Sequence, residues 1–198
     1  MDIKKCISAE LVNTVYHDLS NKLDQKYHYH NLLHTKRVIN SAIKIASHYQ
    51  LSETDLRILL TSCLLHDYGF IYSHINHEEI AAEVAEKILP NYGFDHDQIN
   101  TIQNLILITK VEAKPNNLLE SIIKDADLEY IGSNDFKNIS ENLKIEWIEC
   151  GVVKNDSDFY DIQVKFLHTH NFYTNYMRLG GSDKKNKNIK YAEMMNKS

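Results

Sequence analysis

The amino-acid sequence predicts an all-α protein, and three observations support this prediction. Apolar residues recur at intervals of three and four along most of the chain, which is the periodicity of a buried helix face. No segment alternates apolar and polar residues as a half-buried strand does. The 198 residues include only 2 prolines and 6 glycines, the residues that mark tight turns and flexible linkers. This length suffices for one domain with a substantial core, so we expect a single domain over residues 1–198.

The first two helices are expected over about residues 8–24 and 32–49. Their apolar stripes are formed by Leu11, Val12, Val15, Tyr16, Leu19 and Leu23 in the first, and by Leu33, Val38, Ala42, Ile45 and Ala46 in the second. Between them lies the polar, histidine-rich segment KYHYHN. The spacing of each stripe predicts that one helix face packs on the core.

The third helix is expected over about residues 53–67. Ser52 is placed to cap it, with Asp55 three positions later as in a capping box. The segment LRILLTSCLL is apolar on most faces, which is typical of the central helix of a bundle. We expect Gly69 to end this helix.

Later helices are expected over residues 77–89, 96–110 and 116–130, with two or three more helices in 133–198. Pro90 and Gly93 are expected to close the first of these, and Asp95 to cap the second. Gly132 is the expected stop after the third. The all-α prediction therefore covers the whole chain.

Composition excludes several classes of protein. Hydrophobic residues make up 43% and charged residues 25%, as in ordinary globular proteins. The formal charge of -5 argues against binding of duplex nucleic acid, although a metal ion could still attract a small phosphorylated substrate. The three cysteines form no disulfide framework, and Cys63 is expected in the core. The N-terminal residues lack a signal-peptide core and no apolar run could cross a bilayer, so we expect a cytoplasmic protein without a membrane partner.

Three His-Asp doublets occur, namely His17-Asp18, His66-Asp67 and His96-Asp97. The first lies on the polar face of the first helix, where solvated residues are expected. The third opens a helix, where an acidic residue complements the helix dipole. Only the second ends the most apolar helix, where an unpaired carboxylate is costly and needs either a metal or a basic partner.

His34 and Asp127 provide further candidate ligands. His34 opens the second helix in YHNLLH, and Asp127 falls on the core side of its helix, in KDADLEYIG. Together with the His66-Asp67 doublet they would form a mixed nitrogen and oxygen site. Such a site suits Mn, Fe, Co, Ni, Zn or Mg.

The order His34, His66-Asp67, Asp127 resembles the HD superfamily of phosphohydrolases. YHNLLHTKRV, CLLHDYGF, HEEIAAEVAEKIL and KDADLEYIG are each similar to a motif or helix of that family, and they extend the resemblance over about residues 27–132. The tail 133–198 is less diagnostic and resembles the C-terminal helices of small stand-alone members. The resemblance implies a helical bundle around a metal.

The implied activity is metal-dependent hydrolysis of a phosphate ester, either a monoester or a diester, in a nucleotide or related small compound. The implied metal ligands are His34, His66, Asp67 and Asp127. Asp125 is the alternative to Asp127, but we expect it at the surface or behind the ligands.

The resemblance and the residue types also suggest catalytic and substrate-binding groups. Asp67 would hold the metal and its water, while His77 and Glu78 could act as general acid or base. Glu78 could instead be an acidic first-turn residue. The candidate phosphate-binding residues are Arg37, Asn31, Lys110 and Lys124. Asn31 could instead cap its helix, and the lysines and Arg37 could be solvated charges.

Departures from the family pattern favour one divalent metal. Thr109 stands where binuclear members are expected to offer a histidine, although a second metal could bind through His77. His28 and His30 are expected at the mouth of the site or on the surface. Two alternative functions stay open, an HD-type di-iron oxygenase and a non-catalytic module that binds a nucleotide or metal. The sequence carries no prediction of oligomeric state.

Overall fold

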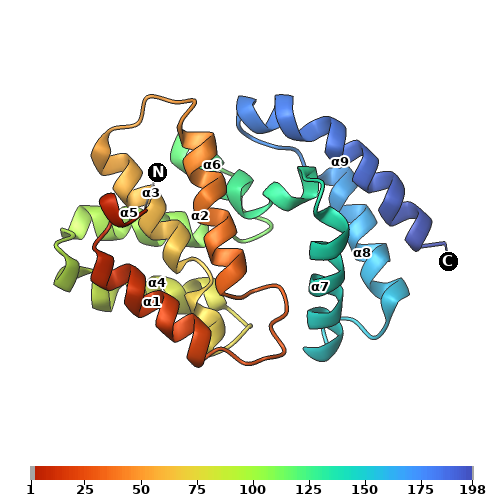
Figure 1. The fold of residues 1–198 in the computed structure, drawn as a ribbon, viewed down its shortest axis with the longest axis horizontal. Coiled ribbons are helices and arrows are strands. Elements are labelled where there is room, and N and C mark those ends of the chain that lie inside the picture. The colour runs from red at the N-terminus through yellow and green to blue at the C-terminus, as the bar shows by residue number, and fades with distance from the viewer. Residues whose placement is uncertain (1–2, 198) are drawn as a thin grey trace. The chain divides into compact units, whose positions relative to one another are not determined.

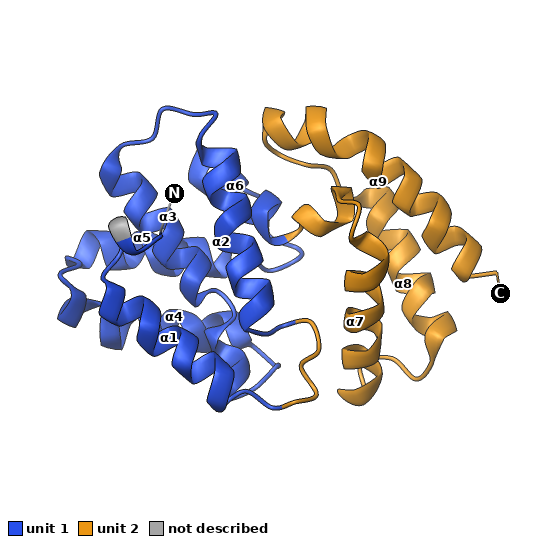
Figure 2. Cartoon of the chain, in the orientation of Figure 1, with its two compact units in different colours: residues 1–24, 30–127 blue, residues 25–29, 128–198 orange. Residues whose placement is uncertain are grey.

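The computed structural model describes residues 3–197, and all regular structure within that range is helical. The predicted all-α class is confirmed. Contacts between Cα atoms divide the chain into two compact units (Figure 2). Unit 1 comprises the chain up to Asp24 and His30–Asp127, and unit 2 comprises Gln25–Tyr29 and the chain from Leu128 onward. The single domain over residues 1–198 stays a prediction.

Unit 1 contains the helices α1 (Ala9–Asn21), α2 (Leu32–Ala46), α3 (Glu53–Leu65), α4 (His77–Ile88), α5 (His96–Leu107) and α6 (Leu118–Asp127) (Figure 1). Helix α3 contacts each of the other five. Every residue from Ile58 to Leu65 is buried, including Cys63. The prediction that this segment forms the central helix of the bundle is therefore confirmed.

Short polar residues fix where three of these helices begin. The side chain of Ser52 accepts a hydrogen bond from the amide of Asp55 at the start of α3. Asp95 and Gln98 form a reciprocal capping box at the start of α5. Asn31 caps α2 by accepting from the amides of Leu33 and His34. The expected caps Ser52 and Asp95 are thus confirmed, as is the capping alternative for Asn31.

Several helices end before the expected residue, and two of these ends carry candidate ligands. Helix α3 stops at Leu65, two residues before the predicted end, and a 3-10 turn, η2 (Tyr68–Ile71), follows. Helix α6 stops at Asp127, and the expected helical residues through Tyr130 belong partly to a second 3-10 turn, η4 (Glu129–Gly132). Such turns commonly tighten the last turn of a helix. The consequence is that His66, Asp67 and Asp127 all lie at the ends of helices.

Gly69 does not end α3, and this expectation was wrong. It lies inside η2, where an added Cβ would meet the carbonyl oxygen of His77 at 2.0 Å. Only glycine permits this close approach between η2 and the first residue of α4. Asn76 precedes α4 in the left-handed conformation, with φ 56°, which asparagine tolerates better than most residues. These two residues together bring His77 toward the His66-Asp67 doublet.

Two further differences concern α2. The helix ends at Ala46, before the expected residue 49, because the backbone of Ser47 already caps it. Leu33 was expected in the apolar stripe, but its side chain is 72% exposed. The other expected stripe residues of α2 are buried. The core-facing stripe of this helix therefore begins after its first turn.

Unit 2 contains α7 (Phe136–Glu149), α8 (Asp156–Thr169) and α9 (Asn175–Met195), which matches the expected two or three C-terminal helices. Its core includes the buried side chains of Phe136, Phe159, Tyr160 and Leu167. The buried carboxylate of Glu146 accepts a 2.8 Å hydrogen bond from the amide of Tyr29, which holds residues 25–29 against α7. Among residues 3–197, no helix combines the length and the hydrophobicity needed to span a bilayer.

Candidate metal centre

Four side chains from three places in the sequence meet inside unit 1. His34 lies in the first turn of α2, His66 and Asp67 follow α3, and Asp127 is the last residue of α6. One ligand atom each from His34, His66 and Asp127 lie within 4.8 Å of one another. Oδ2 of Asp67 lies 3.1 Å from Nε2 of both imidazoles. The spatial arrangement expected from the sequence is therefore present.

The other distances between ligand atoms of this cluster are also short. Oδ1 of Asp127 lies 3.1 Å from Nε2 of His34 and 3.6 Å from Nε2 of His66. The two Nε2 atoms are 3.2 Å apart. The side chains of His34, His66 and Asp67 are at most 7% exposed, while that of Asp127 is 19% exposed. The cluster is thus buried but open at the Asp127 side.

The position of Oδ2 of Asp67 suits contact with a cation better than it suits a hydrogen bond. Its Oδ2 is buried and, although two imidazole nitrogens lie 3.1 Å away, neither contact has the alignment of a hydrogen bond within the described chain. A buried carboxylate oxygen without a donor is costly. A cation between these atoms would satisfy the oxygen, and two imidazole nitrogens with two carboxylates are a donor set that divalent metals accept.

The pKa values in the cluster show how strongly its groups interact. Burial raises the pKa of Asp67, but the charge of His66 and the contacts with both imidazoles hold it well below its usual range. Burial also raises the pKa of Asp127, and the contacts with His34 and His66 again outweigh this and lower it. Burial lowers the pKa of His66, but the two carboxylates raise it well above the usual value. Both carboxylates are therefore ionised at neutral pH.

A second group of polar side chains faces the other oxygen of Asp67. Nε2 of His77 lies 3.6 Å from Oδ1 of Asp67 and 3.4 Å from Oε1 of Glu78. Nδ1 of His77 lies 3.2 Å from the carbonyl oxygen of His74, to which it can only donate. In a neutral His77 the lone pair of Nε2 therefore faces the two carboxylates. All three catalytic candidates, Asp67, His77 and Glu78, lie together.

His30, which was expected at the mouth of the site or on the surface but not among the site residues, belongs to this region. Its ring stacks on Phe70 with centroids 4.3 Å apart, and Phe70 in turn lies 4.2 Å from His77. His30 also contacts the ring of His34 edge-on at 5.7 Å. Its charge is among the influences that lower the pKa of Asp67. The only sequence signal is its position one helical turn before His34, at a point where the helix has not yet begun.

The four candidate phosphate-binding residues differ in their contacts. Arg37 lies against the centre, with Nη2 3.0 Å from Nδ1 of His34. Asn31 caps α2. Lys110 pairs with Glu79, and Lys124 donates to the carbonyl oxygens of Ile108 and Lys110 at 3.1 and 2.6 Å. Burial lowers the pKa of Lys124. Their role toward a substrate stays a prediction, and Arg37 contacts the imidazole of a candidate ligand.

One expectation about an acidic residue was wrong. Asp18 was expected in solvent, but it is buried and accepts a 2.5 Å hydrogen bond from the hydroxyl of Tyr68. Asp125 was expected at the surface or behind the ligands, and its full burial excludes the surface and leaves the second alternative open. The His96-Asp97 doublet is exposed, as expected. Thr109 donates to the carbonyl oxygen of Ile106 at 2.7 Å, which fixes its hydroxyl at the end of α5.

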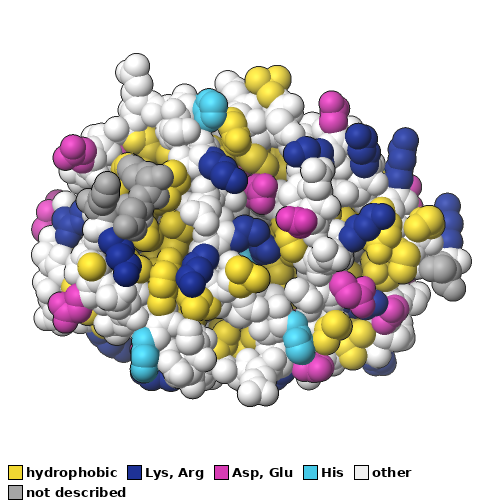
Figure 3. Space-filling view, viewed as in Figure 1, with side chains coloured by type: hydrophobic (Ala, Val, Ile, Leu, Met, Phe, Trp, Pro, Cys, Tyr) yellow, Lys and Arg dark blue, Asp and Glu magenta, His cyan; other side chains and the backbone are white. Residues whose placement is uncertain are grey.

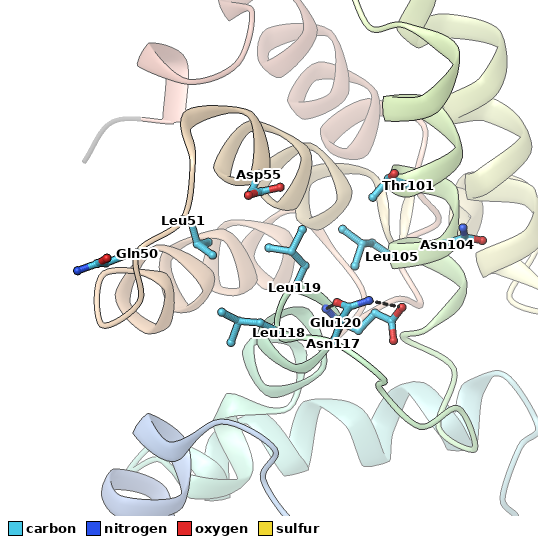
Figure 4. A pocket seen from close by; sticks show the side chains of 10 residues that line it. All are labelled: Gln50, Leu51, Asp55, Thr101, Asn104, Leu105, Asn117, Leu118, Leu119 and Glu120. Carbon is cyan, nitrogen blue, oxygen red and sulfur yellow. Dashed lines mark hydrogen bonds between the residues drawn. The ribbon is translucent and has the colours of Figure 1, made fainter.

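A hollow of about 600 Å³ lies elsewhere in unit 1, between the start of α3, helix α5 and the start of α6 (Figure 4). Its carboxylates serve local caps, since Asp55 accepts from Ser52 and Glu120 from Asn117. None of the predicted site residues lines it. On the face seen in Figure 3, acidic and basic side chains are interspersed. We therefore assign function to the centre around Asp67.

Comparison with known families agrees with this geometry. The family model of the HD domain matches residues 31–129, which is half of the 198 residues. The chain belongs to the HD domain family. The matched segment includes all four candidate ligands, from His34 to Asp127.

The fold of this HD domain protein is also similar to a solved structure. That structure is of a predicted HD superfamily hydrolase from an uncultured Thermotogales bacterium, with a TM-score of 0.63 and 22% sequence identity. The alignment covers 98% of this chain and 97% of the other. At this identity the likeness shows a shared fold. No curated protein matches the chain.

Proposed function

We propose that this HD domain protein is a metal-dependent hydrolase of phosphate esters. The observation that carries the proposal is the convergence of His34, His66, Asp67 and Asp127, with imidazole nitrogens 3.1–3.6 Å from carboxylate oxygens. These four side chains hold one divalent cation. The mixed nitrogen and oxygen donors suit Mn, Fe, Co, Ni, Zn or Mg, and no thiolate is among them.

A cation held by these residues would lower the pKa of a bound water and would neutralise phosphoryl oxygens. The protein's own groups do the remaining work. Asp67 uses Oδ2 as a ligand and turns Oδ1 toward His77, so it can orient a water molecule beside the cation. His77, held through Nδ1 by the carbonyl of His74, presents Nε2 to accept or return a proton. Glu78, with Oε1 3.4 Å from Nε2 of His77, can help to orient that ring.

The substrate is a small phosphorylated compound, and a nucleotide is the class that the family resemblance favours. Arg37 is the basic residue best placed for the phosphate, since it lies beside His34 and a guanidinium can bind two phosphate oxygens at once. Lys110 is less suited, because its ammonium is already paired with Glu79. We propose neither a duplex nucleic acid nor a membrane as a partner, and we expect the protein to act in the cytoplasm.

A second cation is the natural extension of this site. Nε2 of His77 lies 3.6 Å from Oδ1 of Asp67 and 3.4 Å from Oε1 of Glu78, so these three side chains would be the residues to hold it. This arrangement keeps open the alternative of a di-iron oxygenase. The purified protein would then be coloured and contain two irons, whereas the hydrolase hypothesis predicts turnover of phosphate esters with redox-inactive metals such as Mg or Zn.

The test is a screen of p-nitrophenyl phosphate, bis-p-nitrophenyl phosphate, nucleoside monophosphates and cyclic nucleotides with Mn, Mg, Co, Ni and Zn. Asp67→Asn should abolish turnover of any substrate found. The matched control is Asp97→Asn, because Asp97 follows a histidine in the same way but is fully exposed. Metal retained at one or two equivalents with no turnover of any compound would favour the non-catalytic binding module instead.

A further inference from the structure

Three aromatic rings meet beside the candidate centre, and Phe70 contacts the other two. Phe70 lies in η2, shortly after Asp67, and only 5% of it is exposed. The ring of His30 stacks on it, with centroids 4.3 Å apart and an angle of 13° between the planes. The ring of His77 lies 4.2 Å from it at an angle of 41°. The two imidazoles are 6.2 Å apart, so each of them is closer to Phe70 than to the other.

The side chain of His77 is in a place where its orientation has to be fixed. His77 is the first residue of α4, and its side chain is 19% exposed. Two torsions, χ1 and χ2, decide where its ring nitrogens lie. The contact of Nδ1 with the carbonyl oxygen of His74, at 3.2 Å, restrains one edge of the ring. The contact with Phe70 restrains the plane of the ring as well.

The backbone brings Phe70 to this position. Gly69 lets η2 approach α4 so closely that an added Cβ would lie 2.0 Å from the carbonyl oxygen of His77. Phe70 follows Gly69 directly, and its own ring is restrained by burial and by the stacked ring of His30. The ring of His30 in turn meets that of His34 edge-on at 5.7 Å. Phe70 is therefore a restrained neighbour against which His77 can be oriented.

A phenyl ring can neither transfer a proton nor bind a divalent metal, so Phe70 can affect the reaction only through the residues that it contacts. His77 is the contact that matters most, because its Nε2 lies 3.6 Å from Oδ1 of Asp67. The position of a catalytic group is critical, since a displacement of about 1 Å can reduce a rate by about 100-fold.

We propose that Phe70 is a positioning residue that orients the imidazole of His77 toward Asp67 for proton transfer. The inference rests on the role of His77 in the proposed function. Replacement of Phe70 should lower kcat and leave KM and the first metal site unchanged, because Phe70 is neither a ligand nor a substrate contact. A ring that only filled the core would affect stability and not kcat.

The first test is NMR spectroscopy of the wild-type protein, as purified and after addition of Zn²⁺. We expect nuclear Overhauser effects from the ring protons of Phe70 to those of both His30 and His77, because the centroids are only 4.2–4.3 Å apart. In Phe70→Leu the ring signals of His77 should broaden, since the ring then exchanges between orientations. Absence of the effect between Phe70 and His77 in the wild type would overturn the proposal without any variant.

The second test measures turnover of the best phosphate ester from the substrate screen. Phe70→Leu should lower kcat by about 10- to 100-fold, with KM within about twofold of the wild-type value. In a His77→Ala background the same change should have no further effect on kcat, because the residue that Phe70 orients is already gone. Such non-additivity is the mark of two residues that act through one contact.

The matched control is Phe94→Leu. Phe94 also follows a glycine, is equally buried at 5% exposure, and packs against the guanidinium of Arg57. This change should lower the Tm about as much as Phe70→Leu does and leave kcat unchanged. Equal losses of kcat in the two variants, or additive losses with His77→Ala, would reject this inference alone. A wild-type protein that turns over no phosphate ester would instead reject the proposed function on which the inference rests.

Discussion

The hydroxyl of Tyr68 donates a 2.5 Å hydrogen bond to Oδ2 of Asp18, and this bond ties α1 to the turn that follows the His66-Asp67 doublet. Asp18 also pairs with Lys22 at 2.8 Å. Its side chain is 10% exposed, so these partners carry most of its polar contacts. Asp18, from the first His-Asp doublet, thereby holds Tyr68, the residue that directly follows Asp67 of the second doublet.

Tyr68→Phe should lower the free energy of unfolding by roughly 1–3 kcal/mol, because a buried carboxylate oxygen loses its donor. Urea denaturation measures the change. Tyr72→Phe is the control, since Tyr72 is 65% exposed and should change stability by no more than about 0.5 kcal/mol. Equal effects of the two changes would mean that the Asp18 contact contributes nothing.

Asp18 should also give the protein a measurable acid sensitivity. Burial raises the pKa of Asp18, but the bonds from Lys22 and Tyr68 outweigh this and place it below the ordinary value of 3.8. The stability from these bonds is therefore present above pH 3.8 and is lost as the pH falls through the folded-state pKa.

The corresponding measurement is the Tm between pH 6 and pH 3, in wild type and in Asp18→Asn. The variant should start lower and fall less steeply with acid. Asp97→Asn changes an exposed carboxyl and should follow the wild-type curve. A variant curve parallel to wild type throughout would contradict the assigned pKa shift.

Gly69→Ala should destabilise the protein by about 1–3 kcal/mol or more, because the new methyl group would overlap the backbone of His77. It should also weaken metal binding, since η2 begins directly after Asp67. Gly180→Ala is a matched control in α9, where an added Cβ meets nothing within 4 Å and alanine should stabilise the helix by about 0.5–1 kcal/mol. Tolerance of both substitutions would show that the close approach at Gly69 is dispensable.

Local signals in the sequence were sufficient to predict much of the fold. Ser52 and Asp95 predict the starts of α3 and α5 because a cap depends only on the next three residues. The apolar segment around Cys63 predicts the central helix because its composition is also a local property of the sequence. The four metal-ligand candidates also have local signals, because they lie in three short motifs, with His66 and Asp67 in the same one.

Contacts between distant residues could not be predicted in this way. Asp18 is buried because Tyr68, fifty positions later, reaches it. Gly69 is required by the backbone of His77 and not by its own turn. His30 gains its place by stacking on Phe70. In each case the decisive partner lies in another element, and no periodicity or spacing in the sequence identifies it.

His77→Ala should remove proton transfer by His77 and leave the first metal site intact. His77 is not among the four primary ligand candidates, so the variant should retain one equivalent of metal. Turnover should fall by roughly 100- to 10,000-fold, the usual loss when a general acid or base is removed. Metal content by plasma mass spectrometry and turnover of the best substrate provide the two readouts. Undiminished turnover would exclude His77 from catalysis.

Metal binding should stabilise the folded protein only when the buried doublet, His66-Asp67, is intact. Zn²⁺ or Mn²⁺ at 100 times its dissociation constant adds about 2.7 kcal/mol to a protein that binds it when folded. His66→Ala should lose this stabilisation, whereas His96→Ala, in the exposed doublet, should keep it. Thermal melts with and without metal measure the difference. The same response in both variants would place the metal elsewhere.

The most direct measurement is anomalous X-ray diffraction from crystals grown with Mn²⁺ or Zn²⁺. The proposed centre predicts a peak about 2 Å from Nε2 of His34 and His66 and from carboxylate oxygens of Asp67 and Asp127. A metal peak bound by other residues, or no peak at saturating metal, would contradict the claim that these four side chains hold a cation.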